Sequence, residues 1–105
     1  MQNETIDYIS DIDISPKFHE DRSRISSRRV LNALDKYLYI ISVTGQCPPG
    51  FKARRVRGVP GLWKGYVTRG GANWRLTFFM NGDRMLWDRV LNHNEMDIYL
   101  AGLVK

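Results

Sequence analysis

The sequence predicts an α+β fold: an N-terminal strand, two helices, a three-stranded antiparallel meander and a short C-terminal helix. Three observations support this prediction. The chain has 105 residues, the length of one domain with a modest core, so residues 1–105 are expected to form a single domain. Apolar residues recur at helical spacing over the segment RRVLNALDKYLYIISVTG. Asn81-Gly82 separates two apolar segments, which is typical of a β-hairpin.

The N-terminal segment is expected to form a strand followed by a short helix. Ile12 and Ile14 alternate with aspartates, which favours a first strand. Ser15-Pro16 has the pattern of an N-cap followed by proline at the first helical position. A helix from Pro16 to about Arg24 is therefore predicted.

A second helix follows, and either Ser26 or Ser27 could cap its N-terminus. Gly45 and the sequence CPPG end it, because glycine favours the helix C-terminus and proline cannot continue the helix. The apolar residues at helical spacing are Val30, Leu31, Leu34, Leu38 and Ile41.

The second half of the chain predicts the meander and the last helix. Gly58, Pro60 and Gly61 mark a turn. The segments LWKGYVTR, NWRLTFFM and DRMLWDRVL then form three strands, with Gly70-Gly71 ending the first of them. HNEMDIYLAGLVK closes the chain as a short helix.

A two-residue loop at Asn81-Gly82 would define the hairpin register. It would place Met80 opposite Asp83, Phe78 opposite Met85, and Leu76 opposite Trp87. Leu76, Phe78, Met85 and Trp87 would then share one apolar face, which a one-residue slip would scatter.

On the other face of this hairpin, Arg75 would lie opposite Asp88. This pair could be a structural cross-strand ion pair, or Asp88 could hold the guanidinium ready for a phosphate. By the same alternation, Lys64 and Tyr66 should share one face of the preceding strand, with Trp63 and Val67 on the other.

Charge is distributed unevenly along the chain. Residues 1–21 carry a net charge of −5, residues 22–79 a net charge of +11, and residues 80–105 a net charge of −1. Between Phe51 and Arg75 there are seven bases and no acid, so this segment should present a positive field to phosphate or to an acidic partner. A solvated basic surface is the plainer alternative. The bases are Lys52, Arg54, Arg55, Arg57, Lys64, Arg69 and Arg75.

Several classes of protein are disfavoured by the sequence. The N-terminus MQNETIDYISD lacks the basic and apolar regions of a signal peptide, and no apolar run reaches the roughly 20 residues that span a bilayer. Cys47 is the only cysteine, which suits a reducing cytoplasm, and it is expected to be inert. One cysteine with the distant His19 and His93 gives no metal-ligand spacing.

The order of these elements resembles the RelE/ParE superfamily of bacterial toxins from type II toxin–antitoxin systems. RVRGVPGLWKGYV leads into NWRLTFF and then into VLNHNEMDIYL, so the resemblance covers about residues 28–100. The presence of His93 makes the chain more similar to the HigB, YafQ and YoeB branches than to RelE. The matching elements are Val56-Arg57-Gly58, Trp63-Lys64, Trp74-Arg75-Leu76 and the segment from His93 to Tyr99.

The resemblance implies a cytoplasmic, ribosome-dependent mRNA endoribonuclease that needs no metal or other cofactor and is held inactive by a cognate antitoxin. It implies catalytic roles for Lys64, Arg75, His93 and Tyr99. Tyr66 stands where RelE-like members often have a second lysine, which leaves open whether Lys64 or His93 acts as the general base. RNA or phosphate contacts are expected from Lys52, Arg54, Arg55, Arg57, Tyr66 and Arg69.

These residue types suit RNA cleavage by the ribose 2′-hydroxyl. Arginine offers a permanent charge and a planar fork of donors to the phosphorane, and histidine can exchange protons near neutral pH. Tyr99 would position the phosphate or stack on a base. The structural alternatives are a helix-start role for His93, a core position for Tyr99 and a surface position for Lys64.

Two other functions fit the same sequence. A ParE-like inhibitor of DNA gyrase would share the fold, although such members usually lack the combined Lys, Arg and His set. A small basic nucleic-acid-binding module without catalysis would fit the alternation and the basic segment equally well.

Overall fold

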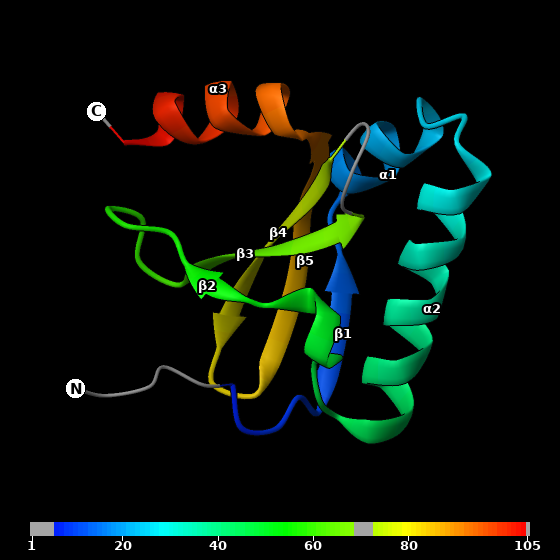
Figure 1. The fold of residues 1–105 in the computed structure, drawn as a ribbon. Helices are drawn as coiled ribbons and strands as arrows, with labels where there is room; N and C mark the ends of the chain where they lie inside the picture. Colours follow the sequence, from blue (N-terminus) through cyan, green and yellow to red (C-terminus); the bar gives the residue numbers. More distant parts are fainter. Residues whose placement is uncertain (1–5, 69–72, 105) are drawn as a thin grey trace.

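The computed structural model describes residues 6–68 and 73–104 and shows a five-stranded mixed sheet flanked by three α-helices (Figure 1). The strand order is β1-β5-β4-β3-β2, with β1 parallel to β5 and the other neighbours antiparallel. Along the chain the elements are β1 (Asp11–Ile14), α1 (Pro16–Ser23), α2 (Arg28–Thr44), the 3-10 helix η1 (Pro49–Phe51), β2 (Arg54–Arg55), β3 (Leu62–Thr68), β4 (Trp74–Asn81), β5 (Arg84–Asn92) and α3 (His93–Leu103).

The helix boundaries follow the predicted capping residues. Ser15 caps α1 by accepting a hydrogen bond from the Phe18 amide, as the Ser15-Pro16 pattern predicts. Of the two candidate caps for α2, Ser27 is the one used. Gly45 ends α2 in the left-handed conformation at φ 71°. Asn92 caps α3 at the end of β5.

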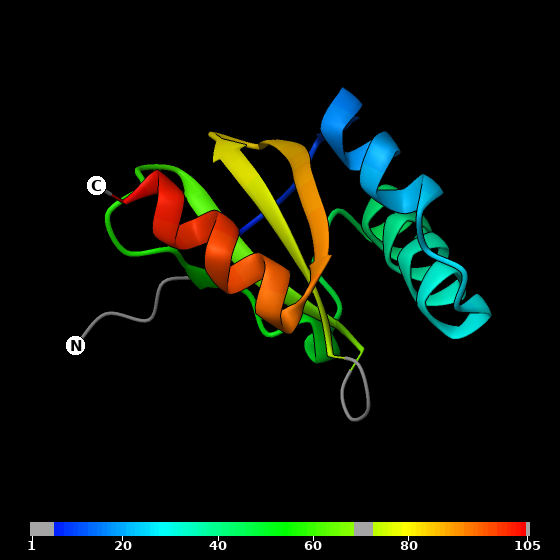
Figure 2. The ribbon, with the colours of Figure 1, turned by 90° about the horizontal axis from the view of Figure 1, so that it is seen from above.

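The helices cover both faces of the sheet. Helices α1 and α2 lie on one side and α3 on the other (Figure 2). The main core lies between the sheet and the first two helices and includes Phe18, Leu34, Ile41, Phe78 and Trp87. Leu62, Leu91 and Met96 are also buried but fall outside that cluster, on the side that α3 covers. Helix α3 therefore covers the part of the second face formed by β4 and β5, above a small apolar patch.

The sheet has one more strand than expected. The predicted three-stranded meander is present as β3, β4 and β5, and the N-terminal strand joins it by parallel pairing with β5. The additional strand β2 is only Arg54-Arg55, which pairs with Trp63 and Lys64. Two exposed arginines have no apolar alternation, so local patterning could not identify this strand.

The predicted hairpin register is wrong by two residues. The loop is Gly82-Asp83 rather than Asn81-Gly82, so Asn81 pairs with Arg84 and Phe78 pairs with Trp87. Gly82 adopts φ 64°, a conformation that favours glycine at the first central position of a two-residue loop. A shift of two residues preserves side-chain alternation, so the predicted apolar face of Leu76, Phe78, Met85 and Trp87 is buried as expected.

A β-bulge changes the register again farther along this hairpin. Phe78 lies opposite Trp87, but its neighbour Thr77 lies opposite Arg89, which leaves Asp88 as the extra residue of β5. Arg75 consequently lies opposite Leu91, and the predicted pairing of Arg75 with Asp88 is wrong. The predicted strand end at Gly70-Gly71 falls outside the described residues.

Gly65 should be intolerant of a side chain because β3 and η1 meet there. A Cβ at Gly65 would lie 2.8 Å from two ring carbons of Phe51, a residue with no exposed surface. Gly65→Ala is expected to destabilise the fold by roughly 1–3 kcal/mol through overpacking. Gly102→Ala in α3 meets open space and should be neutral or stabilising. Urea unfolding of both variants checks this; equal stability would show that Phe51 moves aside freely.

Candidate active site

Four polar side chains from two neighbouring strands lie on the face of the sheet beneath α3. Lys64 of β3 pairs with Thr77 of β4, and Tyr66 pairs with Arg75. Directly opposed residues of an antiparallel pair point to the same face, so these four form one group. The predicted alternation of β3 is confirmed, because Trp63 and Val67 belong to the core on the opposite face.

Arg75 is partly buried and held by an aromatic ring. Its guanidinium carbon lies 4.5 Å from the centroid of the Tyr66 ring, a cation–π arrangement. Its Nε is buried, and within residues 6–68 and 73–104 it has no hydrogen-bond partner. A buried, unsatisfied N–H is costly, and a ligand oxygen would relieve that cost. This donor is suited to an anionic oxygen.

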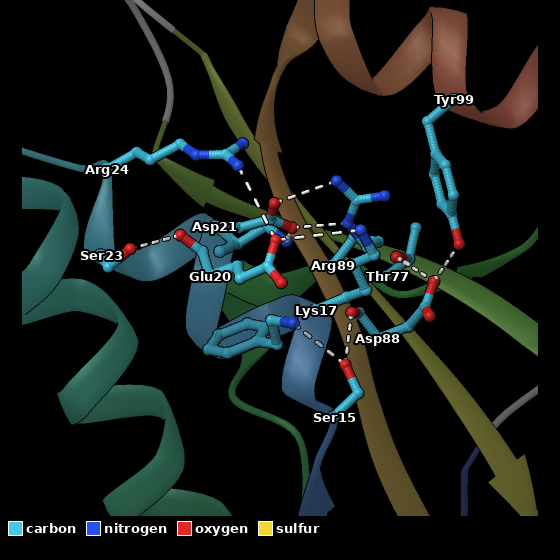
Figure 3. Close-up of polar contacts among 12 residues, drawn as sticks. Ser15, Lys17, Glu20, Asp21, Ser23, Arg24, Thr77, Asp88, Arg89 and Tyr99 are labelled. Atoms are coloured by element: carbon cyan, nitrogen blue, oxygen red, sulfur yellow. Dashed lines mark hydrogen bonds and ion pairs between the residues drawn. The ribbon is translucent and has the colours of Figure 1, made fainter.

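The carboxylate of Asp88 joins β4, β5 and α3 (Figure 3). The Tyr99 hydroxyl donates a hydrogen bond of 2.6 Å to Asp88 Oδ2, and the Thr77 hydroxyl donates one of 3.1 Å to the same atom. The backbone carbonyl of Asp88 accepts a hydrogen bond of 2.8 Å from Ser15 Oγ. Asp88 therefore fixes Tyr99 rather than Arg75.

Arg89, the next residue of β5, forms a bidentate ion pair with Asp21 of α1 (Figure 3). Its Nε and Nη2 donate to the two carboxylate oxygens at 2.7 and 3.0 Å, and the Val90 amide donates to Asp21 Oδ2 at 3.1 Å. The Arg89 guanidinium also lies 4.8 Å from the centroid of the Tyr99 ring. This contact links the ion pair to α3.

The environment of Tyr99 keeps its phenol protonated. Burial and the hydrogen bond to Asp88 together raise the pKa of Tyr99 well above its usual value. The ionised phenolate would be poorly solvated and would face the Asp88 carboxylate. At neutral pH Tyr99 is therefore a neutral hydroxyl that donates to Asp88.

The raised pKa of Tyr99 predicts a loss of stability at high pH. Above about pH 10 the unfolded chain loses the phenol proton while the folded chain retains it, so this stabilisation is complete below pH 10 and is lost as the pH rises further. Tyr99→Phe should flatten the decline of unfolding free energy between about pH 10 and 11, measured by urea titration. Parallel curves for the two proteins would contradict the prediction.

His93 is the first residue of α3 and directly follows the end of β5. Its side chain is 47% exposed, and Nε2 lies 3.4 Å from Asp97 Oδ2 one turn along the helix. The preceding residue, Asn92, lies opposite Trp74, next to Arg75 on β4. The helix-start position expected as the structural alternative is observed. Its exposure also leaves the imidazole accessible to a ligand.

Comparison with solved structures identifies the fold. A chain of the RelB–RelE antitoxin–toxin complex from Methanococcus jannaschii superimposes with a TM-score of 0.69 at 14% identity, covering 83% of this chain and 96% of that one. YafQ from E. coli matches with a TM-score of 0.64 at 20% identity, covering 83% and 97% of the two chains. The chain has the RelE-like toxin fold. The Staphylococcus aureus YoeB structure is also similar, with a TM-score of 0.61 at 15% identity over 80% and 97% of the chains.

No family model matches the sequence, and no curated protein matches it. The expected RelE-like architecture is confirmed by structure, and YafQ and YoeB are among the similar folds. The expected likeness to HigB stays a prediction.

The basic segment of this RelE-like fold is divided between the two faces of the sheet. Arg54 lies opposite Lys64 and so shares the polar face, whereas Arg55 lies opposite Trp63 and its guanidinium packs 4.9 Å from the centroid of that ring. Lys52 and Arg57 are exposed in the connections around β2. Arg69, predicted to contact RNA, falls outside the described residues.

The described part of the chain has no cluster of metal ligands and no activated thiol. Its His, Cys, Asp and Glu residues form no cluster of three or more that could hold a metal ion. Burial raises the pKa of the Cys47 thiol to about 11, so this thiol is a poor nucleophile at neutral pH. None of the described helices combines the length and apolar character needed to cross a membrane.

The sequence interpretation missed the carboxylates that organise the site. The sequence pattern places Asp21 only within the acidic segment of residues 1–21, and it places Asp88 opposite Arg75. The polar pair Asp88-Arg89 within the apolar segment MLWDRVL was the available signal, because a charged pair inside a strand needs partners. Identifying those partners required the β-bulge and the position of α1.

Proposed function

We propose that the chain is the toxin of a toxin–antitoxin pair and cleaves mRNA on the ribosome without a metal. The observation that carries this proposal is the unsatisfied Nε of Arg75 on a polar face that also holds Lys64. His93 begins α3 two residues after Leu91, which lies opposite Arg75. The RelE-like fold supports it, since RelE and YafQ appear in solved antitoxin–toxin complexes. The similarity of this chain to those structures is a similarity of fold.

The proposed reaction is attack of the ribose 2′-hydroxyl on the adjacent phosphorus with departure of the 5′-oxygen. Arg75 would stabilise the added negative charge, because its Nε is buried and its guanidinium is already held against the Tyr66 ring. Lys64 would support this charge or help to activate the 2′-hydroxyl, and His93 would exchange a proton from the exposed edge. Tyr99 would position the substrate.

Basic residues beside this face would hold the RNA backbone. Arg54 extends the row that contains Lys64 and Thr77, and Lys52 and Arg57 are exposed nearby in sequence. Each phosphate contact releases a counterion, so binding to ribosome-bound mRNA should weaken as salt rises. Tyr66, whose ring supports Arg75, is placed to contribute to the same surface.

A cognate antitoxin is the second partner we propose. A nuclease acting on translating ribosomes would harm its own cell, and the chain has a formal net charge of +5. An acidic segment of the antitoxin would complement the basic face. High-yield expression of the active chain alone, without growth arrest, would contradict this part of the proposal.

Expression in a bacterial host distinguishes the three candidate functions. The nuclease predicts growth arrest with cleaved mRNA, and His93→Ala should relieve both. A gyrase inhibitor predicts intact mRNA with altered DNA supercoiling, and a passive binding module predicts neither effect. Full mRNA cleavage by folded His93→Ala would exclude the proposed role of that residue.

A further inference from the structure

The β-bulge in β5 places two consecutive charged side chains on the same face of the sheet. Neighbouring residues of a regular strand point to opposite faces, yet Asp88 bonds Thr77 and Tyr99 while Arg89 lies opposite Thr77 and beneath the Tyr99 ring. The extra residue of the bulge makes this arrangement possible. One strand thus supplies both the carboxylate and the guanidinium that contact Tyr99.

Helix α1 supports this bulge from the edge of the sheet. Strand β1 pairs with β5 only as far as Trp87, so the next backbone groups of β5 need other partners. Ser15 Oγ donates to the Asp88 carbonyl, and Asp21 accepts from the Val90 amide and from Arg89. Asp21 is 4% exposed, so the support lies in the protein interior.

The hydrogen-bond direction at Tyr99 determines what its hydroxyl can offer to a substrate. Its single proton is donated to Asp88 Oδ2 across 2.6 Å, a short distance typical of a hydroxyl bonded to a carboxylate. The phenol oxygen can also accept a hydrogen bond. Tyr99 in this arrangement presents an acceptor, and its ring is held on one side by Arg89.

We propose that Asp88 is a positioning residue that orients the Tyr99 hydroxyl so that its oxygen accepts a hydrogen bond from the ribose 2′-hydroxyl of bound RNA. This inference rests on the proposed RNA-cleaving function. Asp88 does not contact the reacting atoms. Its carboxylate fixes the direction of the Tyr99 O–H bond and the position of the Tyr99 ring. This hydrogen bond holds the 2′-hydroxyl in position in the bound substrate. As attack on the phosphorus begins, the hydroxyl turns its single proton from Tyr99 to the general base, and the 5′-oxygen departs.

A double-mutant cycle on ribosome-bound mRNA tests this role. Asp88→Ala and Tyr99→Phe should each lower kcat by roughly 10–100-fold, since small misplacements of a reacting group have effects of this size, with little change in KM. Because both changes remove the same interaction, the double variant should lose no more than the worse single variant. Asp11→Ala, which removes an exposed ion pair to Arg84 at the other end of β5, is the matched control and should keep wild-type kcat.

Urea unfolding of every variant confirms that folded protein is compared, and Tyr99→Phe carries the test if the alanine variant does not fold. Asp88→Asn keeps an oxygen that can accept from Tyr99, so it should restore most of the wild-type kcat. Wild-type kcat in folded Asp88→Ala or Tyr99→Phe, or losses that multiply in the double variant, would overturn the inference while leaving the proposed nuclease intact. A wild-type chain that cleaves no ribosome-bound mRNA would overturn the nuclease and this inference together.

Discussion

Arg75→Ala is expected to lower kcat for mRNA cleavage on ribosomes by at least about 10²–10³-fold, the usual effect of removing one preorganised charge-stabilising donor. The guanidinium packs on the Tyr66 ring. Its buried Nε has no hydrogen-bond partner among the described residues, so it can donate to a ligand. Its removal takes away one cation–π contact, worth about 0.5–1 kcal/mol at an exposed site, so the fold should persist. Single-turnover cleavage of a programmed ribosome complex measures the effect.

Two further variants separate charge from geometry at this position. Arg75→Lys keeps the positive charge but loses the planar fork and the guanidinium stack on Tyr66, so its activity should lie between wild type and Arg75→Ala. Arg84→Ala removes an arginine that is exposed on β5 and pairs with Asp11, and it should cleave normally. Wild-type kcat in folded Arg75→Ala would remove the central residue of the proposed mechanism.

Asp21→Ala should destabilise the fold by roughly 3–5 kcal/mol, because it leaves the Arg89 guanidinium and the Val90 amide without their shared acceptor. The Asp21 side chain is 1% exposed and that of Arg89 is 19% exposed, so water cannot fully replace the carboxylate. The urea midpoint should fall by about 1 M or more. The change would also release α1 from the edge of β5.

The matched control for Asp21 is another aspartate–arginine pair of this chain. Asp35 accepts a hydrogen bond of 3.0 Å from Arg22, but the two side chains are 64% and 40% exposed. Asp35→Ala should therefore change stability by only about 0–1 kcal/mol. Equal losses for Asp21→Ala and Asp35→Ala would show that burial does not set the strength of the Arg89 pair.

The helices of this fold could be predicted because their signals are local. Ser15-Pro16 and Gly45 act within one helical turn of the ends they define. Strand pairing depends on distant residues, and the Arg54-Arg55 strand has no pattern of its own. The hairpin register failed for a related reason: Asn81-Gly82 and Gly82-Asp83 are both plausible two-residue loops, and both retain the apolar face.

The same distinction between local and distant signals applies to the candidate site. Alternation alone placed Lys64 and Tyr66 on one face, and the RelE-like resemblance singled out Arg75, His93 and Tyr99. The partners of those residues could not be predicted, because one extra residue in β5 moves Asp88 from Arg75 to Tyr99. Tyr99, for which a core position is the structural alternative, is partly buried and makes a polar contact with Asp88 instead.

The chemistry of the cleaved ends tests the proposed reaction most directly. Attack by the 2′-hydroxyl leaves a 5′-hydroxyl on the downstream fragment and a 2′,3′-cyclic phosphate on the upstream one. We predict these ends when the purified chain acts on mRNA in translating ribosomes, with far fewer fragments from Arg75→Ala over the same time. Fragments carrying a 5′-phosphate, or mRNA that stays intact while the wild-type chain arrests growth, would contradict the proposed nuclease mechanism.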